Sequence, residues 1–256
     1  MPRLSVGAEQ DALDYTLKTP AGCDDPDTVV VYVHGFASHQ CGEKALYFGE
    51  RFLAQWCAYL TFDLRGHGAS GGTMEELTIS RAIEDVETVL VWARERFARC
   101  VMIGSSLGGQ VAAWAAARHP EAVAANLLIA PAFGFYENRV RDLGEEGLAR
   151  LRAEGRATIR NEWVTVTVGR ALVDDAARYP VDRLIASYRT PTLILHGTDD
   201  ASVPVAGSVD FVRRSAARPL ELVVFGGGDH RLTDRKAALF DAMAGFLGRL
   251  GVCPSL

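Results

Sequence analysis

The sequence of 256 residues has no apolar run long enough to cross a membrane. A transmembrane helix needs about 18 consecutive apolar residues, and the longest apolar stretch here, residues 122–135, is interrupted by Asn126 and Pro131. The first ten residues, MPRLSVGAEQ, also lack the apolar core of a secretory signal. We therefore expect no integral membrane segment and a cytoplasmic protein.

The chain also lacks an excess of basic residues. It has 32 acidic and 27 basic side chains, and its formal net charge is −5. A protein that binds duplex nucleic acid usually presents a basic face, so no nucleic-acid partner is expected. Hydrophobic residues make up 48% and charged residues 23%, which excludes a disordered chain, a collagen and a coiled coil.

Cysteine is scarce and scattered along the chain. No pair among the five cysteines has the short spacing of a zinc site or of a thioredoxin-like redox site. They are Cys23, Cys41, Cys57, Cys100 and Cys253. The sequence therefore predicts reduced thiols, no metal and no cofactor.

What the sequence does contain is an alternation of short apolar runs with amphipathic segments. The apolar runs are typical of strands buried on both faces of a parallel sheet. They are Val29–Val33, Tyr59–Phe62, Val101–Gly104, Asn126–Ile129, Thr192–Leu195 and Glu221–Phe225, with helices expected over 42–55, 79–97, 107–118 and 236–250. This order predicts an α/β fold with a mostly parallel central sheet, to which Leu4–Val6 and Tyr15–Lys18 add an antiparallel edge.

One segment breaks this alternation. More than fifty residues, from Phe133 to Arg189, lie between consecutive predicted strands, which is too long for an ordinary crossover. We interpret residues 134–189 as a cap insertion within a single domain, above the edge of the sheet where α/β proteins bind ligands. The side chains expected to line or contact a substrate pocket are His39, Phe133, Phe135, Tyr136, Trp163 and Val166. The alternative is that the cap residues among them pack a small core of the cap itself.

A candidate nucleophile lies between a predicted strand and a predicted helix. The sequence Gly104-Ser105-Ser106-Leu107-Gly108 is a G-x-S-x-G pattern, whose central serine occupies a sharp turn that exposes its hydroxyl. The pattern alone is weak, but the strand before it and the buried helix after it support it. We favour Ser106 over Ser105, which lacks the flanking glycines.

A serine hydroxyl needs a base, and six histidines are available. His34, His67 and His196 are flanked by glycine, where histidine often has a structural role in a turn. His230 instead follows the last predicted strand and a Gly-Gly-Gly turn, downstream of the serine in the chain. We therefore expect His230 to be the base.

Two further parts complete the predicted site. The base needs an orienting carboxylate, and the strand ending at His196 is followed by two adjacent acids, Asp199 and Asp200, of which only one can face His230. The oxyanion of an acyl-transfer intermediate needs preorganised donors. We expect the backbone amide of Leu107, at a helix N-terminus, and that of Phe36, in the loop after the first strong strand.

Five motifs together resemble the α/β-hydrolase superfamily along nearly the whole chain. They are VYVHGF, FDLRGHGAS, VMIGSSLGG, LILHGTDDASVP and GGGDHRLTD. The resemblance implies a single α/β-hydrolase domain with the triad order serine, aspartate, histidine. It also implies that the acid is the aspartate three residues after the glycine of HG, which is Asp200.

Two subfamilies are similar to different parts of the sequence. The segments RGHGASGGTMEELTISRAIEDV and LLIAPA resemble bacterial cinnamoyl and feruloyl esterases, whereas GSSLGG and DHRL resemble abhydrolase-type acyl-protein thioesterases. The resemblance implies a serine hydrolase that acts on a small-molecule ester or thioester, with carboxylesterase activity ranked first. A peptidase, a dehalogenase, a lactonase and a non-enzymatic binding protein are the rivals, and a dehalogenase would normally need aspartate in place of Ser106.

Overall fold

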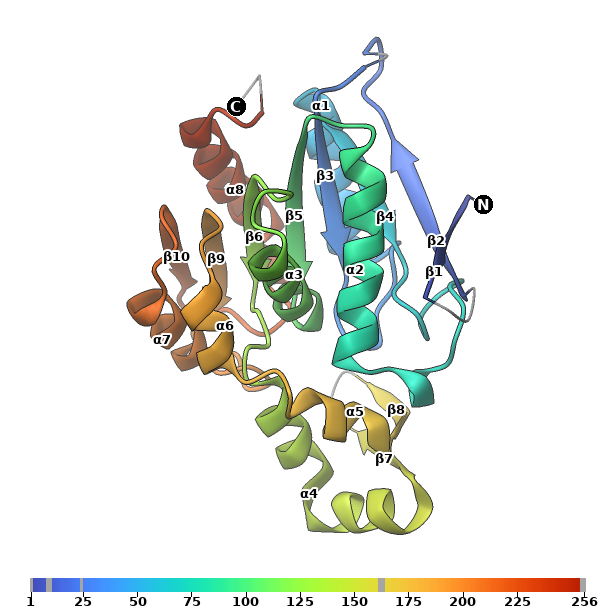
Figure 1. Ribbon diagram of the computed structural model, residues 1–256. Helices are drawn as coiled ribbons and strands as arrows, with labels where there is room; N and C mark the ends of the chain where they lie inside the picture. The colour runs from blue at the N-terminus through green and yellow to red at the C-terminus, as the bar shows by residue number, and fades with distance from the viewer. Residues whose placement is uncertain (1, 8–10, 24, 161–163, 254–256) are drawn as a thin grey trace.

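The computed structural model describes residues 2–7, 11–23, 25–160 and 164–253. Eight of the described strands form one sheet: β1 (Arg3–Val6), β2 (Asp11–Lys18), β3 (Thr28–Val33), β4 (Ala58–Phe62), β5 (Arg99–Ser105), β6 (Ala125–Ile129), β9 (Thr192–Gly197) and β10 (Leu220–Phe225). Their order across the sheet is β1-β2-β4-β3-β5-β6-β9-β10 (Figure 1). The strands from β4 to β10 in this order pair in parallel, and β1 and β2 pair antiparallel at one edge. This is the α/β fold expected from the sequence, including its antiparallel edge.

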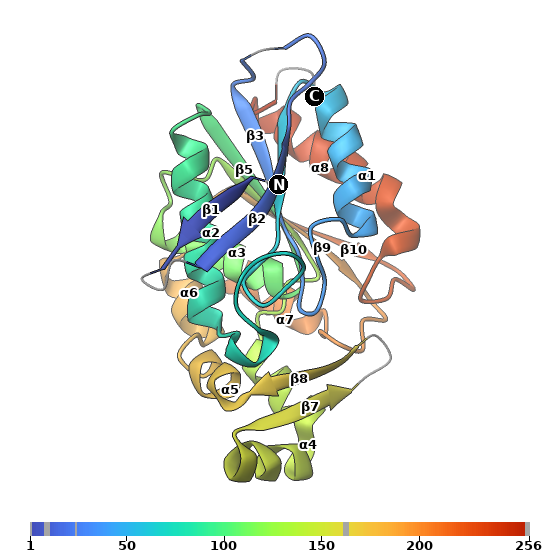
Figure 2. The same ribbon diagram turned by 90° about the vertical axis from the view of Figure 1, so that its right-hand side faces the viewer.

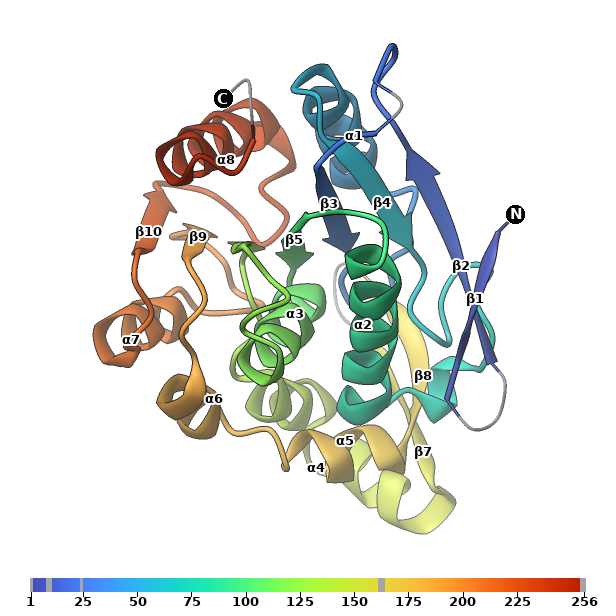
Figure 3. The ribbon, with the colours of Figure 1, turned by 45° about the horizontal axis from the view of Figure 1, so that its top comes forward.

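Helices cover both faces of the sheet. One face carries α1 (Glu43–Ala54) and α8 (Lys236–Leu250), and the other carries α2 (Ile79–Arg94), α3 (Leu107–Arg118), α6 (Val181–Ser187) and α7 (Ala206–Arg214) (Figure 3). Successive side chains of a strand point to opposite faces, so Val30 and Tyr32 of β3 pack beneath α1, whereas Val29, Val31 and Val33 face α2 and α3. The resulting two cores explain why these strands are apolar at every position.

Most of the predicted insertion forms a separate layer at one end of the molecule, whereas its last helix, α6, packs against α3 and α7 beside the sheet. The layer contains α4 (Phe135–Glu154), the antiparallel pair β7 (Arg156–Arg160) and β8 (Thr165–Gly169), and α5 (Arg170–Ala176). Helix α4 bends at Gly144, whose φ of 60° interrupts the helical geometry. Figures 1 and 2 place this layer beyond the carboxyl ends of the parallel strands. We use the name cap for residues 134–189.

Polar contacts attach the cap to the sheet domain at the start of α2. The backbone amide and the hydroxyl of Ser80 both donate to the carboxylate of Asp175 on α5, each over 2.7 Å. Strand β8 packs against the short helix η1 (Met74–Glu76), and a Cβ added to Gly169 would lie 2.1 Å from the carbonyl oxygen of Glu75. No described helix is both long and apolar enough to span a membrane.

Candidate active site

The turn between β5 and α3 exposes Ser106. This residue has φ 55° and ψ −117°, a left-handed conformation that is uncommon for a residue with a Cβ. Its peptide is fixed on both sides, because its amide donates to the carbonyl of Ile129 over 2.9 Å and its carbonyl accepts from the amide of Ala132 over 3.0 Å. Such a strained turn is typical of a nucleophile elbow.

The glycines on either side of the turn are required by close backbone contacts. A Cβ on Gly104 would lie 2.6 Å from the carbonyl oxygen of Gly108, and a Cβ on Gly108 would lie 2.1 Å from that of Val33. Contacts this short do not occur between real atoms, so no other residue fits at these positions without movement of the backbone. The sequence pattern G-x-S-x-G therefore has a steric cause in this fold.

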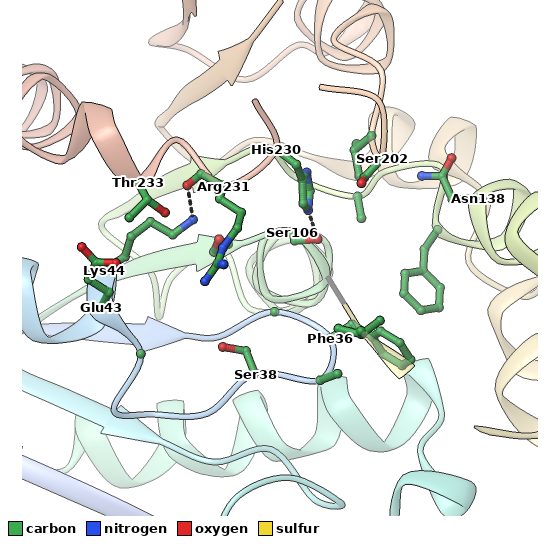
Figure 4. Close-up of a pocket in the computed structure, with 18 of the residues that line it drawn as sticks. Phe36, Ser38, Glu43, Lys44, Ser106, Asn138, Ser202, His230, Arg231 and Thr233 are labelled. Atoms are coloured by element: carbon green, nitrogen blue, oxygen red, sulfur yellow. Dashed lines mark hydrogen bonds between the residues drawn. The ribbon is translucent and has the colours of Figure 1, made fainter. Parts of the chain in front are cut away.

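The structure brings Ser106, His230 and Asp200 together. The Nε2 atom of His230 lies 3.0 Å from the Oγ of Ser106, and its Nδ1 atom lies 2.7 Å from Oδ2 of Asp200. Of the two adjacent acids, Asp200 faces His230, whereas Asp199 is exposed and accepts a hydrogen bond from the hydroxyl of Thr198. Figure 4 shows His230 directly over Ser106.

The charge of Asp200 is stabilised by four donors. The backbone amides of Ser202 and Val203 donate to Oδ1 over 3.0 and 2.7 Å, and His196 Nε2 lies 3.2 Å from Oδ2. Burial alone would raise the pKa of Asp200, but the hydrogen bonds from His196 and His230 hold it well below its usual range. An ionised Asp200 accepts a hydrogen bond from Nδ1–H of His230, which leaves Nε2 as the acceptor that faces the hydroxyl of Ser106.

The adjacent strands β9 and β10 explain how the acid and the base meet. The loop that follows β10 packs directly on the end of β9, where a Cβ added to Gly197 would lie 2.1 Å from the carbonyl oxygen of Gly228. The amide of Asp199 also donates to that carbonyl over 2.9 Å. The side chain of Asp229 then accepts from the amides of Arg231 and Leu232, which fixes the turn that presents His230.

The two predicted oxyanion donors, the amides of Phe36 and Leu107, belong to segments that meet at the elbow. The loop after β3 approaches the elbow so closely that a Cβ on Gly35 would lie 3.1 Å from the carbonyl oxygen of Ser105 and 3.3 Å from the Cβ of Ser106. Within the part of the chain that the structure describes, the amides of Phe36 and Leu107 donate no hydrogen bond. Two unused amides beside a candidate nucleophile can donate hydrogen bonds to a developing oxyanion and so stabilise its charge.

Two buried histidines hold the loop that carries Phe36. His34 Nε2 accepts from the amide of Leu64 over 3.0 Å, and its Nδ1 lies 2.8 Å from the carbonyl oxygen of Gly35. His67 Nε2 accepts from the amide of Ala37 over 3.1 Å. Burial, together with the nearby His67 ring, lowers the pKa of His34 to about 3, so both nitrogens serve as neutral hydrogen-bonding groups. This is the structural role expected for histidine beside glycine in a turn.

A cavity of about 230 Å³ opens over Ser106 and His230. In Figure 4, Lys44, Arg231 and Thr233 lie on one side of this pair, and Asn138 and Ser202 lie on the other. The Nζ of Lys44 donates to the carbonyl of Arg231 over 2.7 Å. Burial, reinforced by the neighbouring guanidinium of Arg231, lowers the pKa of Lys44 to about 8.

The residues expected to line the pocket are only partly found there. Phe135 lines the cavity and lies edge-on to Phe36, with 6.1 Å between ring centroids. Phe133 points away and stacks on Phe211 of α7 over 4.3 Å. The remaining described members of the set are not in the cavity wall: His39 is exposed, Tyr136 is 37% exposed, and Val166 packs against the core. Trp163 lies outside the described residues.

Several polar residues of the wall were not expected from the sequence. Asn138 and Arg139 lie three and four positions after Phe135, so they share its face of α4. That helical spacing could have placed both residues in the cavity wall. Charged residues on a helix, however, usually indicate a face exposed to solvent. Arg231 directly follows His230, and Ser202 comes two residues after Asp200. Their closeness in the chain to two predicted site residues was a signal that could have identified them.

The site contains no cluster suited to a metal ion within the described residues. No three side chains of His, Cys, Asp or Glu converge there or elsewhere in those ranges. A hydroxyl, an imidazole, a carboxylate and two free amides in this arrangement are the groups that acyl-transfer chemistry requires.

Comparison with protein-family models decides the family. Residues 24–177, more than half of the chain, match the model described as serine aminopeptidase, S33. The chain belongs to this family. It is an α/β-hydrolase and a hydrolytic enzyme, as the sequence motifs implied.

The individual relatives are named as hydrolases, but their names refer to the hydrolysis of different bonds. The mitochondrial palmitoyl-protein thioesterase ABHD10 of Bos taurus is 25% identical over 209 residues, covering 80% of this chain and 68% of its own. A monoacylglycerol lipase of Mycolicibacterium smegmatis is 26% identical over 256 residues, with 88% and 90% covered. The solved structure of Est1E from Butyrivibrio proteoclasticus with bound ferulic acid has a TM-score of 0.81 at 22% identity over 97% of this chain and all of the other, and it shows a shared fold.

Proposed function

We propose that the chain is a serine hydrolase that cleaves carboxylic esters through an acyl-enzyme intermediate. The observation that carries the proposal is the contact of Ser106 Oγ with His230 Nε2 at 3.0 Å, with Asp200 at 2.7 Å from Nδ1. These three groups have the geometry of nucleophile, base and orienting acid.

In the proposed reaction, Ser106 Oγ attacks the ester carbonyl carbon as its proton passes to His230 Nε2. The carbonyl oxygen becomes an oxyanion that accepts from the amides of Phe36 and Leu107. The intermediate collapses, the bond to the alcohol breaks, and His230 returns the proton to the departing oxygen. Water, deprotonated by the same imidazole, then attacks the acyl-serine and releases the acid.

A second candidate is the hydrolysis of acyl thioesters. It is supported by relatives named palmitoyl-protein thioesterase, which match 80% of this chain. A thiolate leaves with little help because thiols have a pKa near about 8.5, whereas an alkoxide needs a proton from the imidazole. We rank esters first because the proton-transfer geometry is complete, and we place feruloyl esters below both because Phe36 and Phe135 are the only aromatic rings besides Tyr32 in the described cavity wall.

Aminopeptidase activity, which the family description names, receives little support from the wall of the cavity. A free amino terminus is a cation and would need a carboxylate. Among the described wall residues the sole carboxylate, that of Glu43, already pairs with Lys236. The proposed substrate is therefore a small-molecule ester or thioester, and the proposed compartment is the cytoplasm, whereas the ABHD10 relatives are named as mitochondrial.

The test combines covalent labelling with turnover. The wild-type protein should react with a fluorophosphonate probe and hydrolyse p-nitrophenyl esters from acetate to octanoate, with methyl ferulate slower. Ser106→Ala should lose the label and about 10⁴-fold or more of kcat/KM while keeping its melting temperature. Ser105→Ala is the matched control and should still be labelled. Labelling that survives in Ser106→Ala but disappears in Ser105→Ala would overturn the assignment, and a higher kcat/KM for methyl ferulate would reverse the substrate ranking.

A further inference from the structure

Two adjacent polar side chains of the cap are buried in the wall of the catalytic cavity without using their full hydrogen-bonding capacity. Asn138 is 6% exposed and Arg139 is 7% exposed, and both line the cavity over Ser106. The Nε of Arg139 is buried and has no hydrogen-bond partner. Among the described residues, none accepts from or donates to the side chain of Asn138.

Buried polar groups are normally hydrogen-bonded, and an unpaired donor costs about 1–3 kcal/mol. The fold nevertheless holds the guanidinium of Arg139 firmly in place. It lies 5.2 Å from the ring centroid of Phe36 and 5.1 Å from that of Phe135, and one terminal nitrogen pairs with Asp142 over 2.6 Å. The guanidinium of Arg139 is therefore fixed beside the cavity while its buried Nε–H has no partner, and a cation that is positioned before a ligand arrives is suited to binding one.

The charge of the wall indicates what the ligand carries. Among the described residues of the wall, the charged side chains are the cations Lys44, Arg139 and Arg231 and one carboxylate, that of Glu43, which pairs with Lys236. The rest of the molecule has the opposite balance, since the whole chain has a net charge of −5. Burial also lowers the pKa of Arg139 in spite of the neighbouring Asp142, because removal from water penalises the charged form.

We propose that Arg139, assisted by Asn138, binds a carboxylate on the substrate, so that the enzyme favours esters or thioesters that bear a second, free carboxylate. The inference rests on the proposed function, and it specifies the substrate class of the same site. A planar guanidinium suits a carboxylate because its donors lie in one plane. Lys44, on the other side of Ser106, adds to the attraction of an anionic substrate into the cavity.

The test compares matched substrates that differ by one carboxylate. One pair places it on the acyl side, p-nitrophenyl monoglutarate against p-nitrophenyl pentanoate. The other places it on the leaving group, 4-carboxyphenyl butanoate against 4-carbamoylphenyl butanoate. For each pair, the ratio of kcat/KM for the carboxylate to that for the neutral ester is measured in wild type and in variants, so that intrinsic reactivity cancels.

Arg139→Gln should lower this ratio by about tenfold or more in at least one pair, because a charge-assisted hydrogen bond is lost. Asp142→Asn should raise the same ratio, because it removes the carboxylate that competes for Arg139. Arg150→Gln is the matched control, since Arg150 lies on the same helix, pairs with Glu146 on the surface and is absent from the cavity wall. Its ratio should equal that of the wild type.

Opposite shifts from Arg139→Gln and Asp142→Asn distinguish recognition from a structural role. If Arg139 only supported the cap, both variants would lower the melting temperature and reduce the two substrates in proportion, and that result overturns the inference. A wild type that disfavours the carboxylate in both pairs also overturns it. Hydrolysis of p-nitrophenyl pentanoate by wild type and its loss in Ser106→Ala report on the proposed function separately, so the two failures can be told apart.

Discussion

The catalytic residues and the cap residues solve different problems with different parts of the chain. Around Ser106 the backbone itself fixes the geometry, because Gly104 and Gly108 let neighbouring segments approach so closely that a Cβ added at either would lie under 3 Å from a carbonyl oxygen. On the cap, by contrast, the cavity wall consists of long side chains on α4 that keep an unused donor. The comparison sets a candidate reaction centre whose groups already contact one another against a cap surface that keeps an unpaired donor.

Asp200→Asn should have the largest effect on the catalytic side of this comparison. The amide keeps the shape of the side chain, but its NH₂ group competes with Nδ1–H of His230 and favours the wrong tautomer. We expect kcat to fall about 10⁴-fold, as for the corresponding change in other triads. Asp199→Asn, on the exposed neighbour, is the matched control. Stopped-assay rates with p-nitrophenyl butanoate measure both, and a loss in the Asp199 variant that equals the loss in the Asp200 variant would contradict the geometry.

The next effect concerns the pH dependence of stability. Burial lowers the pKa of His34 to about 3, below the value near 6.5 of an unfolded chain. The unfolded state therefore binds this proton more readily, and the stabilisation is complete above about pH 6.5 and is lost as the pH falls toward about 3. His67 shifts in the same direction, also through burial.

We expect the free energy of unfolding in urea to fall between pH 7 and pH 5 with a slope approaching about 1.4 kcal/mol per pH unit for each such group. His34→Gln should flatten this slope, whereas replacement of the exposed His39 should leave it intact. A slope that is the same in all three proteins would show that the loop around Phe36 is not held by a neutral imidazole.

The last comparison separates two phenylalanines that are two positions apart. Phe133 is buried against Phe211, so Phe133→Ala should lower stability by about 3–5 kcal/mol through the cavity that it leaves. Phe135 lines the catalytic cavity, and Phe135→Ala should change the ratio of octanoate to butanoate hydrolysis by several-fold, since each buried CH₂ contributes about 0.8 kcal/mol. Melting curves and chain-length series measure the two outcomes. Equal loss on every chain length in Phe135→Ala would place that residue in the core of the cap.

The sequence predicted the structure best where local sterics or complete burial allow only a narrow choice of residue type. The strands β3, β5 and β6 were located to within two residues because both of their faces are buried, and α3 and α8 have the predicted bounds. Ser106 and His230 stand out in the sequence for a similar reason, since glycines must surround a turn that contacts other backbone. Such steric requirements are local, and a single sequence records them directly.

The sequence was less informative where tertiary contacts decide. Phe133 and Phe135 are the same residue type, and only the path of the chain before α4 turns one toward Phe211 and the other toward Ser106. Arg139 belongs to a charged helix that periodicity alone assigns to solvent. Cys57 and Cys253 are 196 positions apart, yet their sulfur atoms lie 2.8 Å apart in the fold, a proximity that spacing along the chain does not reveal.

The pairing of β6 with β9 has a consequence for how such an enzyme acquires new substrates. The chain leaves the sheet after Ile129 and re-enters it in the neighbouring strand, where Ile129 is in register with Leu195. Because these strands are parallel, the stretch leaves at the carboxyl end of β6 and returns at the amino end of β9. The sheet thus fixes both of its ends in neighbouring strands, and lengthening such a connection costs little entropy. One contiguous piece of gene can therefore be exchanged or extended during evolution, and selectivity can be inherited as a module while the chemistry beneath it stays the same.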